Sequence, residues 1–171
     1  ESKYYNLDGS LTSRRTWKYD DKGNKIESKY YNLDGSLTSK RTWKYDDKGN
    51  QIETNYYSKN GNLSMKKHWK YDDKGNQIQY KSYNTDGSNF HNDIKKYDYK
   101  GNLIESKSYN LDGSLTSRRT WKYDDKGNLI SENSYMSVDG SLTPKETWKY
   151  DDKGNWISKI TYDNGIPKKI K

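Results

Sequence analysis

The chain has 171 residues and a formal net charge of +8, but only 28% of its residues are hydrophobic and its mean hydropathy is −1.49. That composition excludes a thick apolar core, and the absence of cysteine excludes disulfides and thiolate metal sites. The six Trp and 18 Tyr argue against disorder, because disordered segments are poor in aromatic residues.

A 26-residue unit recurs along almost the whole chain, and its clearest copy is ESKYYNLDGSLTSRRTWKYDDKGNKI at residues 1–26. A period of this length is typical of proteins that stack similar units against one another. We therefore expect one repeat domain over residues 1–171, in an excised or processed fragment because the chain opens inside a repeat. The predicted copies are 1–26, 27–52, 53–78, 79–104, 105–130 and 131–157, with a partial copy at 158–171.

Each copy contains two turn signals separated by two strand signals. Residues 6–9 read Asn-Leu-Asp-Gly and residues 20–23 read Asp-Asp-Lys-Gly, which favours a type I turn followed by a left-handed glycine. The segments between them, such as 11–19 and 25–31, are rich in Thr, Trp and Tyr and lack Gly and Pro, so they predict strands. About thirteen strands follow, all antiparallel because the connections are too short for crossovers.

The predicted fold is all-β. It is an antiparallel meander of tandem 26-residue two-strand repeats forming an open twisted or spiralling, largely single-layer sheet. One repeat buries too little apolar surface to offset its loss of backbone entropy, so each copy needs its neighbours. A homodimer through one sheet face is an alternative way of covering the aromatic side chains.

The sequence is compatible with two registers of the strands. Three-residue loops pair Tyr5 with Leu11 and place Ile26 on the face opposite Trp17, whereas four-residue loops place Ile26 and Tyr30 beside Trp17. Turn chemistry favours the first choice and the grouping of apolar residues favours the second. The cluster that both choices keep on one face is Leu11, Trp17 and Tyr19.

Aromatic residues at two repeat positions are the candidate binding residues. Successive Trp residues, two strands apart, would lie roughly 9.6 Å from one another, which resembles the spacing of alternate sugars in an extended β-linked glycan. The same residues also suit the core of a thin sheet, which is the commoner use, and Lys95 interrupts the series. The candidate ligand-binding residues are Trp17, Trp43, Trp69, Trp121, Trp148, Tyr19, Tyr45, Tyr71, Tyr123 and Tyr150.

The charge pattern weighs against nucleic acid. Basic and aromatic residues alternate at residues 14–19, as in some single-strand binders. Acidic pairs such as Asp20-Asp21 and Asp46-Asp47 return in every repeat, so the sequence predicts that positive charge is diluted and forms no continuous stripe. No segment is apolar enough to span a membrane, and we expect no membrane insertion.

Catalysis, metals and cofactors find little support. His68 and His91 occupy different repeat positions and have no recurring nucleophile or carboxylate beside them. The Asp-Asp-Lys-Gly turns lack the spaced carboxylates of a calcium-binding loop. We expect a non-enzymatic protein with no metal site and no cofactor.

Two segments depart from the repeat. In residues 89–96, NFHNDIKK, Phe90 and Ile94 stand one position away from the usual Leu and Trp, which indicates a phase shift and favours a bulge over a specialised contact site. The copy from Ser131 has an extra residue in its turn and Pro144 within a strand, so irregular pairing is expected there.

The strings YDDKGNKI, YDYKGNLI and YNLDGSL resemble the tyrosine-aspartate repeats of bacterial RHS/YD proteins, and are also similar to the bacterial variant of the MORN repeat. The first resemblance implies curling sheets on cell surfaces or in toxin shells, and the second implies interaction platforms. YYNLDGSL is remotely similar to aromatic-rich wall-binding repeats. Neither resemblance transfers functional residues to this chain.

Together these features predict an extended binding or display surface for glycan or protein ligands, secreted or on the surface of a bacterium. The alternative is a structural shell or spacer attached to an effector domain outside this fragment.

Overall fold

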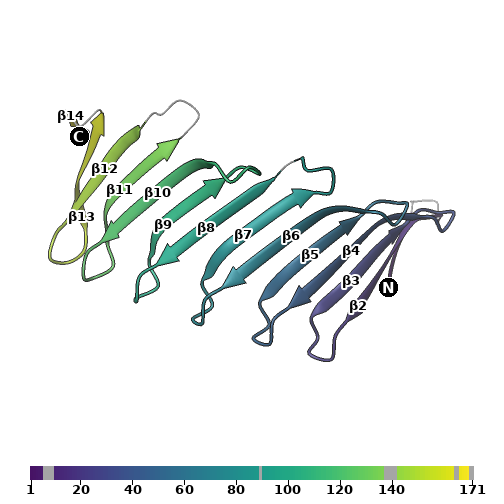
Figure 1. Cartoon of the computed structure of the whole chain (residues 1–171). Coiled ribbons are helices and arrows are strands. Elements are labelled where there is room, and N and C mark those ends of the chain that lie inside the picture. The colour runs from purple at the N-terminus through teal and green to yellow at the C-terminus, as the bar shows by residue number, and fades with distance from the viewer. Residues whose placement is uncertain (6–9, 89, 137–141, 164–165, 170–171) are drawn as a thin grey trace. The chain divides into compact units, whose positions relative to one another are not determined.

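Every regular element in the described part of the chain is a β-strand (Figure 1). The computed structural model describes residues 1–171 except 6–9, 89, 137–141, 164–165 and 170–171. The strands are β1 (Ser2–Tyr5), β2 (Leu11–Tyr19), β3 (Lys25–Tyr31), β4 (Leu37–Tyr45), β5 (Gln51–Tyr57), β6 (Leu63–Tyr71), β7 (Gln77–Asn84), β8 (His91–Tyr97), β9 (Leu103–Tyr109), β10 (Leu115–Tyr123), β11 (Leu129–Met136), β12 (Leu142–Tyr150), β13 (Trp156–Asp163) and β14 (Ile166–Lys169).

The fourteen strands form one antiparallel meander in chain order, and the sheet is not closed into a barrel. This confirms the predicted all-β meander, with β14 added to the thirteen or so expected strands. The chain divides into two compact units, which are residues 1–71 with 80–90 and residues 72–79 with 91–171. Each unit contains complete repeats.

The turns have the predicted conformation. The Asp20 amide donates to the Asn24 carbonyl at 2.9 Å, and the Gly23 amide donates to the Asp20 carbonyl at 3.0 Å. These bonds enclose a three-residue loop, as turn chemistry predicted. Gly23 has a φ of 84° and nothing lies within 4 Å of a Cβ built there, so glycine is required by backbone conformation and not by space.

A β-bulge beside the turn between β2 and β3 resolves the two register alternatives. Tyr19 pairs with Lys25, whereas Trp17 pairs with Ser28, so Ile26 is an extra residue in β3. The prediction of a three-residue loop is therefore correct. Because of the bulge, Ile26 nevertheless lies on the same face as Trp17, which is the face that four-residue loops predicted. The same device follows the other turn type, where Tyr5 pairs with Leu11 but Tyr4 pairs with Ser13.

The sheet has two chemically different faces. Trp17 and Arg15 lie on one of them, opposite Ser28 and Tyr30 respectively, and this is named the Trp face. The other face carries Glu27, and the same glutamate position in later repeats, and is named the Glu face. Side chains of one strand alternate between the two.

No hydrophobic residue in the described ranges is buried, which confirms a largely single-layer sheet. The most buried side chains are small or polar and lie in the middle of strands. They are covered by long neighbours, as where the Arg15 guanidinium lies 3.9 Å from the centre of the Tyr30 ring beside Ser28. The buried residues are Ser28, Thr54, Asn55, Glu105 and Ser131.

The predicted phase shift in residues 89–96 is wrong where β8 pairs with β9. Lys95 pairs with Ser106, the position that Trp17 and Ser28 hold in the first hairpin, and the only register shift is at Lys96/Tyr97. That shift is the bulge common to the repeats, and Asn89 lies outside the described residues. Where β8 faces β9, the segment therefore changes side chains and keeps the register of the first hairpin.

The irregular pairing predicted near Pro144 is confirmed. Glu132 pairs with Glu146 and Ser134 with Thr143, so β12 has one more residue than β11 around Pro144. Proline has no amide hydrogen for the ladder, which explains why the bulge lies there. The inserted turn residue of this copy falls within 137–141, outside the described residues.

Candidate functional site

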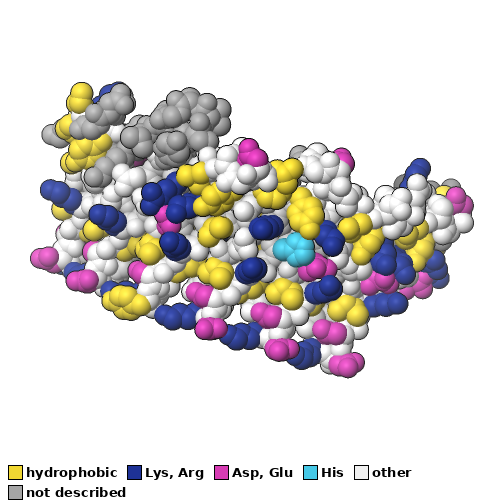
Figure 2. Space-filling model, viewed as in Figure 1, with side chains coloured by type: hydrophobic (Ala, Val, Ile, Leu, Met, Phe, Trp, Pro, Cys, Tyr) yellow, Lys and Arg dark blue, Asp and Glu magenta, His cyan; other side chains and the backbone are white. Residues whose placement is uncertain are grey.

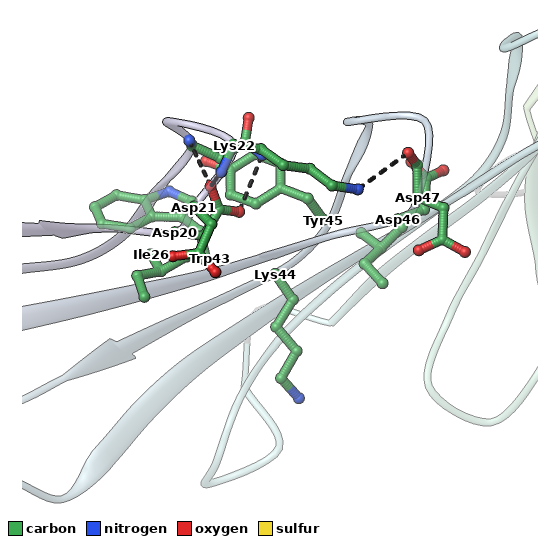
Figure 3. Close-up of a pocket in the computed structure, with 11 residues that line it drawn as sticks. Asp20, Asp21, Lys22, Ile26, Trp43, Lys44, Tyr45, Asp46 and Asp47 are labelled. Carbon is green, nitrogen blue, oxygen red and sulfur yellow. Dashed lines mark hydrogen bonds between the residues drawn. The ribbon is translucent and has the colours of Figure 1, made fainter.

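A groove of about 430 Å³ lies between two successive turns of the first unit (Figure 3). Trp43 and Tyr45 of β4 line it together with Ile26 and Ile52, the bulge residues of β3 and β5. Apolar rings thus meet a rim of charged turn residues, because the bulge places each Ile on the Trp side. The rim consists of Asp20, Asp21, Lys22, Asn24, Lys44, Asp46 and Asp47.

The Tyr of this groove ties its repeat to the preceding one. Its hydroxyl donates to a backbone carbonyl twenty residues earlier, from Tyr45 to Lys25 at 2.9 Å. Tyr71 bonds Gln51 at 3.0 Å in the same way, and Tyr97 bonds Gln77 at 3.1 Å. Burial raises the pKa of Tyr45, with a further contribution from the charge of Asp20. The phenol therefore stays a hydrogen-bond donor at neutral pH.

The turns that border the groove are closed by their first residue. The Asp20 carboxylate accepts from the Asn24 side-chain amide at 3.0 Å, and from the Lys22 and Asn24 backbone amides at 3.0 and 2.8 Å. The Asn24 side chain is the main reason that the pKa of Asp20 lies below its usual value, against partial desolvation. The same lowering occurs at Asp46, Asp72, Asp98, Asp124 and Asp151.

In several Lys-Gly turns the lysine side chain forms a hydrogen bond with the equivalent turn of the next repeat. Lys22 Nζ donates to the Asp47 carbonyl at 3.5 Å, as the dashed line in Figure 3 marks. In the second unit Lys74 bonds the Tyr99 carbonyl and Lys100 the Asp125 carbonyl, both at 2.6 Å. Sequence analysis missed this role, although a lysine at the same place in every repeat was its signal.

The predicted binding residues lie on the Trp face or beside its turns, and they are partly exposed. The five ladder tryptophans are neither buried nor fully exposed, whereas Tyr19 is 56% exposed. Their rings contact the chain's own side chains: Arg15 lies 5.9 Å from Trp17, and Tyr80 lies 5.6 Å from Trp69. The structure brings Trp43 and Tyr45 into one groove, and a ligand-binding role for the set stays a prediction.

The histidines lie in hydrogen-bonded or ionic pairs on the sheet. His91 Nε2 is 2.9 Å from Asp93, which also accepts from Ser108 Oγ at 2.6 Å. Asp93 thus lies between Ser and His, unlike a nucleophile relay in which His lies between the other two. His68 lies 3.7 Å from Glu53, and burial lowers the pKa of its ring. Over the described ranges, no group of three or more His, Asp or Glu could hold a metal ion.

The fold and its groove define a class, an open single-sheet protein of tandem hairpin repeats. A family model with the description "Uncharacterised protein" matches residues 46–170, so the chain belongs to that family. None of the curated proteins compared with the chain matches it. No helix in the part that the structure describes has the length and apolar character needed to cross a membrane.

One solved structure of a toxin complex shares the fold. A chain of the Photorhabdus luminescens Tc holotoxin pore is 15% identical, with a TM-score of 0.67 over 98% of this chain. A chain of TcdB2-TccC3 without its hypervariable C-terminal region is 14% identical over 96% of this chain, with a TM-score of 0.48. This chain spans 9% and 11% of their respective lengths. At 15% identity the likeness to the holotoxin chain shows the fold alone.

Proposed function

We propose that the chain is a non-enzymatic structural module, a stretch of shell or spacer sheet in a larger extracellular or surface-associated protein. The observation that carries this proposal is the use of the repeated side chains. Tyr45 reaches back to the preceding repeat and Lys22 reaches forward to the following one. These recurring side chains thus form hydrogen bonds between neighbouring copies, as a scaffold requires.

The comparisons support this proposal at the level of fold. The similarity to the holotoxin chain covers nearly all of this chain but only a small part of that one, as expected for one stretch of a long repeat sheet. The resemblance of YDDKGNKI to RHS/YD repeats points the same way, since such repeats build shells. The bacterial and extracellular setting belongs to this proposal as well.

Deletion of one whole repeat tests the module. Removal of residues 27–52 keeps every link in phase, because Lys22 then faces Asp73 where it faced Asp47. We expect a cooperatively folding protein with strand-type circular dichroism and a moderately lower midpoint of unfolding. Deletion of residues 27–39 is the matched control. It removes the length of one strand and one turn, so every later strand would run in the opposite direction relative to the strands before the deletion. Equal loss of folding in both variants would contradict interchangeable repeats.

The groove favours a second candidate function, binding of a neutral sugar. Trp43 offers a partly exposed ring, and a cavity of about 430 Å³ is large enough for a small ligand. Stacking on Trp with hydroxyls directed to rim carboxylates is how such a site would hold a sugar. Protein ligands would use the same exposed rings.

Fluorescence titration with neutral β-linked oligosaccharides separates this candidate from a pure scaffold. A binding groove predicts a saturable change that Trp43→Leu reduces and that Trp156→Leu leaves unchanged, since Trp156 lies outside the groove and is 53% exposed. No change in the parent protein rules out the sugar groove and leaves the scaffold proposal standing.

A further inference from the structure

The acidic and basic residues that alternate in the sequence are separated in the folded sheet. The paired aspartates lie in the turns, as at Asp20-Asp21, whereas many lysines and arginines lie on the strands of the Glu face. In Figure 2, Lys and Arg side chains are spread over the viewed face, and many Asp and Glu side chains lie along its lower rim, with Lys and Arg side chains among them. The dilution of positive charge predicted from the sequence therefore does not describe this face.

Cations outnumber carboxylates on the Glu face of the first unit. The strand pairings place Lys18 opposite Glu27, Lys29 opposite Lys40, and Lys66 opposite Asn55. The carboxylates of this face are Glu1, Glu27 and Glu53, and the cations are Lys3, Arg14, Lys18, Lys29, Lys40, Lys44, Lys66, Lys70 and Lys81.

The carboxylates are also covered by the cations around them. Glu27 lies 3.1 Å from Lys29, 3.3 Å from Lys40 and 3.7 Å from Lys18, so one negative charge is shared by three positive ones. The Lys18 side chain is 68% exposed while that of Glu27 is 15% exposed, and Lys44 and Glu53 show 65% and 15%. A molecule approaching this face meets ammonium groups and not carboxylates.

The exposed lysines form a row across the strands. Lys18, Lys44 and Lys70 occupy the same repeat position, two strands apart, which corresponds to roughly 9.6 Å between neighbours. This spacing resembles that of alternate sugars in an extended β-linked chain. Because a row of regularly spaced cations favours a linear polymer with regularly spaced anions, we propose that the Glu face binds a linear acidic polysaccharide lying across the strands.

The aromatic rings of the Glu face favour a polysaccharide over a nucleic acid. The Arg14 guanidinium lies 4.4 Å from the centre of the Tyr31 ring, and Lys40 Nζ lies 4.9 Å from that of Tyr57. These rings are engaged by the chain's own cations, whereas bases of a single strand need free rings on which to stack. This site lies on the face opposite the rings of the groove and shares only Lys44 of the groove rim with it. Its presence does not depend on the scaffold proposal.

The test compares two variants with the same loss of charge. One variant replaces by Gln the lysines of the row and the lysines at the same position in the later repeats, which are Lys18, Lys44, Lys70, Lys96, Lys122 and Lys149. The other replaces by Gln the turn lysines of the same six repeats, which are Lys22, Lys48, Lys74, Lys100, Lys126 and Lys153. Affinity of the full chain for two β-linked acidic polysaccharides, hyaluronate and polymannuronate, is measured at about 50 mM and 200 mM salt. Circular dichroism and thermal unfolding check that both variants fold.

We expect the parent protein to bind and to lose affinity with salt, the row variant to bind roughly tenfold more weakly, and the turn variant to bind within about twofold of the parent. No binding by the parent, or equal losses in the two variants, would overturn the site, the second result showing an effect of net charge alone. Tighter binding to single-stranded DNA or to anionic phospholipid vesicles than to either polysaccharide would overturn the assigned ligand.

Discussion

The strands end in turns along two opposite sides of the sheet, which are named its edges. The turns at the two edges have the same backbone conformation but different side-chain hydrogen bonds. One edge carries the Lys-Gly turns, such as Asp98–Asn102, and the other carries the Asp-Gly turns, such as Asn110–Ser114. In both, the first residue bonds the fifth through backbone atoms at 2.9 Å, and a glycine with φ of 84–90° ends the turn. The turn type is therefore set by backbone and glycine at both edges.

The side chains then make the edges unequal. Asp98 accepts three hydrogen bonds within its turn, whereas Asn110 donates one to Ser114 at 3.1 Å. Lys100 continues to the next turn at one edge, while Leu111, 64% exposed, offers no polar group at the other. Thr85 replaces this Leu in one copy and does bond back to Leu63 and Ser64. Joining of repeats is thus concentrated at the Lys-Gly edge.

Truncation of a ring beside the Lys-Gly edge has the largest expected effect. Trp43→Ala removes the ring that lines the groove together with Ile26 and Ile52, and we expect about 2 kcal/mol less free energy of unfolding. Leu33→Ala at the Asp-Gly edge is the control, because Leu33 is 62% exposed and should change little. Urea denaturation measures both, and equal losses would contradict the difference between the edges.

Removal of the first turn residue has the second-largest expected effect on stability. Asp98→Ala deletes the acceptor of three hydrogen bonds, and Asn110→Ala deletes the donor of one. We expect the thermal midpoint to fall clearly more for Asp98→Ala, because two backbone amides also lose their acceptor. The comparison fails if Asn110→Ala is the more damaging substitution.

Loss of the cross-repeat hydroxyl should be smaller. Tyr45→Phe removes the bond to the Lys25 carbonyl and should cost about 1 kcal/mol. Tyr19→Phe is matched in chemistry but affects an exposed ring, so we expect no measurable change in denaturant midpoint. A loss of similar size in both variants would show that the hydroxyl bond does not join repeats.

Acid should weaken the Lys-Gly edge by a modest amount at each turn. The pKa of Asp98 is lowered in the folded protein, chiefly by Asn102, so its stabilisation is present above the unfolded pKa of about 3.9 and is lost as pH falls through the folded pKa. Asp98→Asn cannot titrate and should show a smaller decrease in stability between about pH 5 and pH 3. Identical acid profiles would contradict this assignment.

The sequence predicted those parts of the fold that depend on short local signals. The turn strings and their glycines predicted where the hairpins turn. The two-residue spacing of Trp17 and Tyr19 predicted that both lie on one face of the sheet. The register was harder because loop chemistry and apolar grouping each supported a different answer, and a bulge at Ile26 satisfies both. A bulge leaves no compositional signal, since Ile is an ordinary strand residue.

The groove and the charged faces were less accessible to sequence reasoning. Lys18, Asp20 and Lys22 are neighbours along the chain, yet the first lies on the Glu face and the other two border the groove. Window-averaged charge cannot show such a separation. The bond from Lys22 to Asp47 joins residues 25 apart. The sequence alone does not indicate which backbone carbonyl accepts from this lysine, because the acceptor depends on how neighbouring repeats stack.

Amide hydrogen exchange at the two edges tests the central claim most directly, because the claim is that repeats are joined chiefly at the Lys-Gly turns. The amides of Asp98 and Gly101 are compared with those of Asn110 and Gly113, whose backbone hydrogen bonds are closely similar in length. We predict slower exchange for Asp98 and Gly101 in the native protein at neutral pH. Equal rates, or slower exchange at Asn110 and Gly113, would contradict the account.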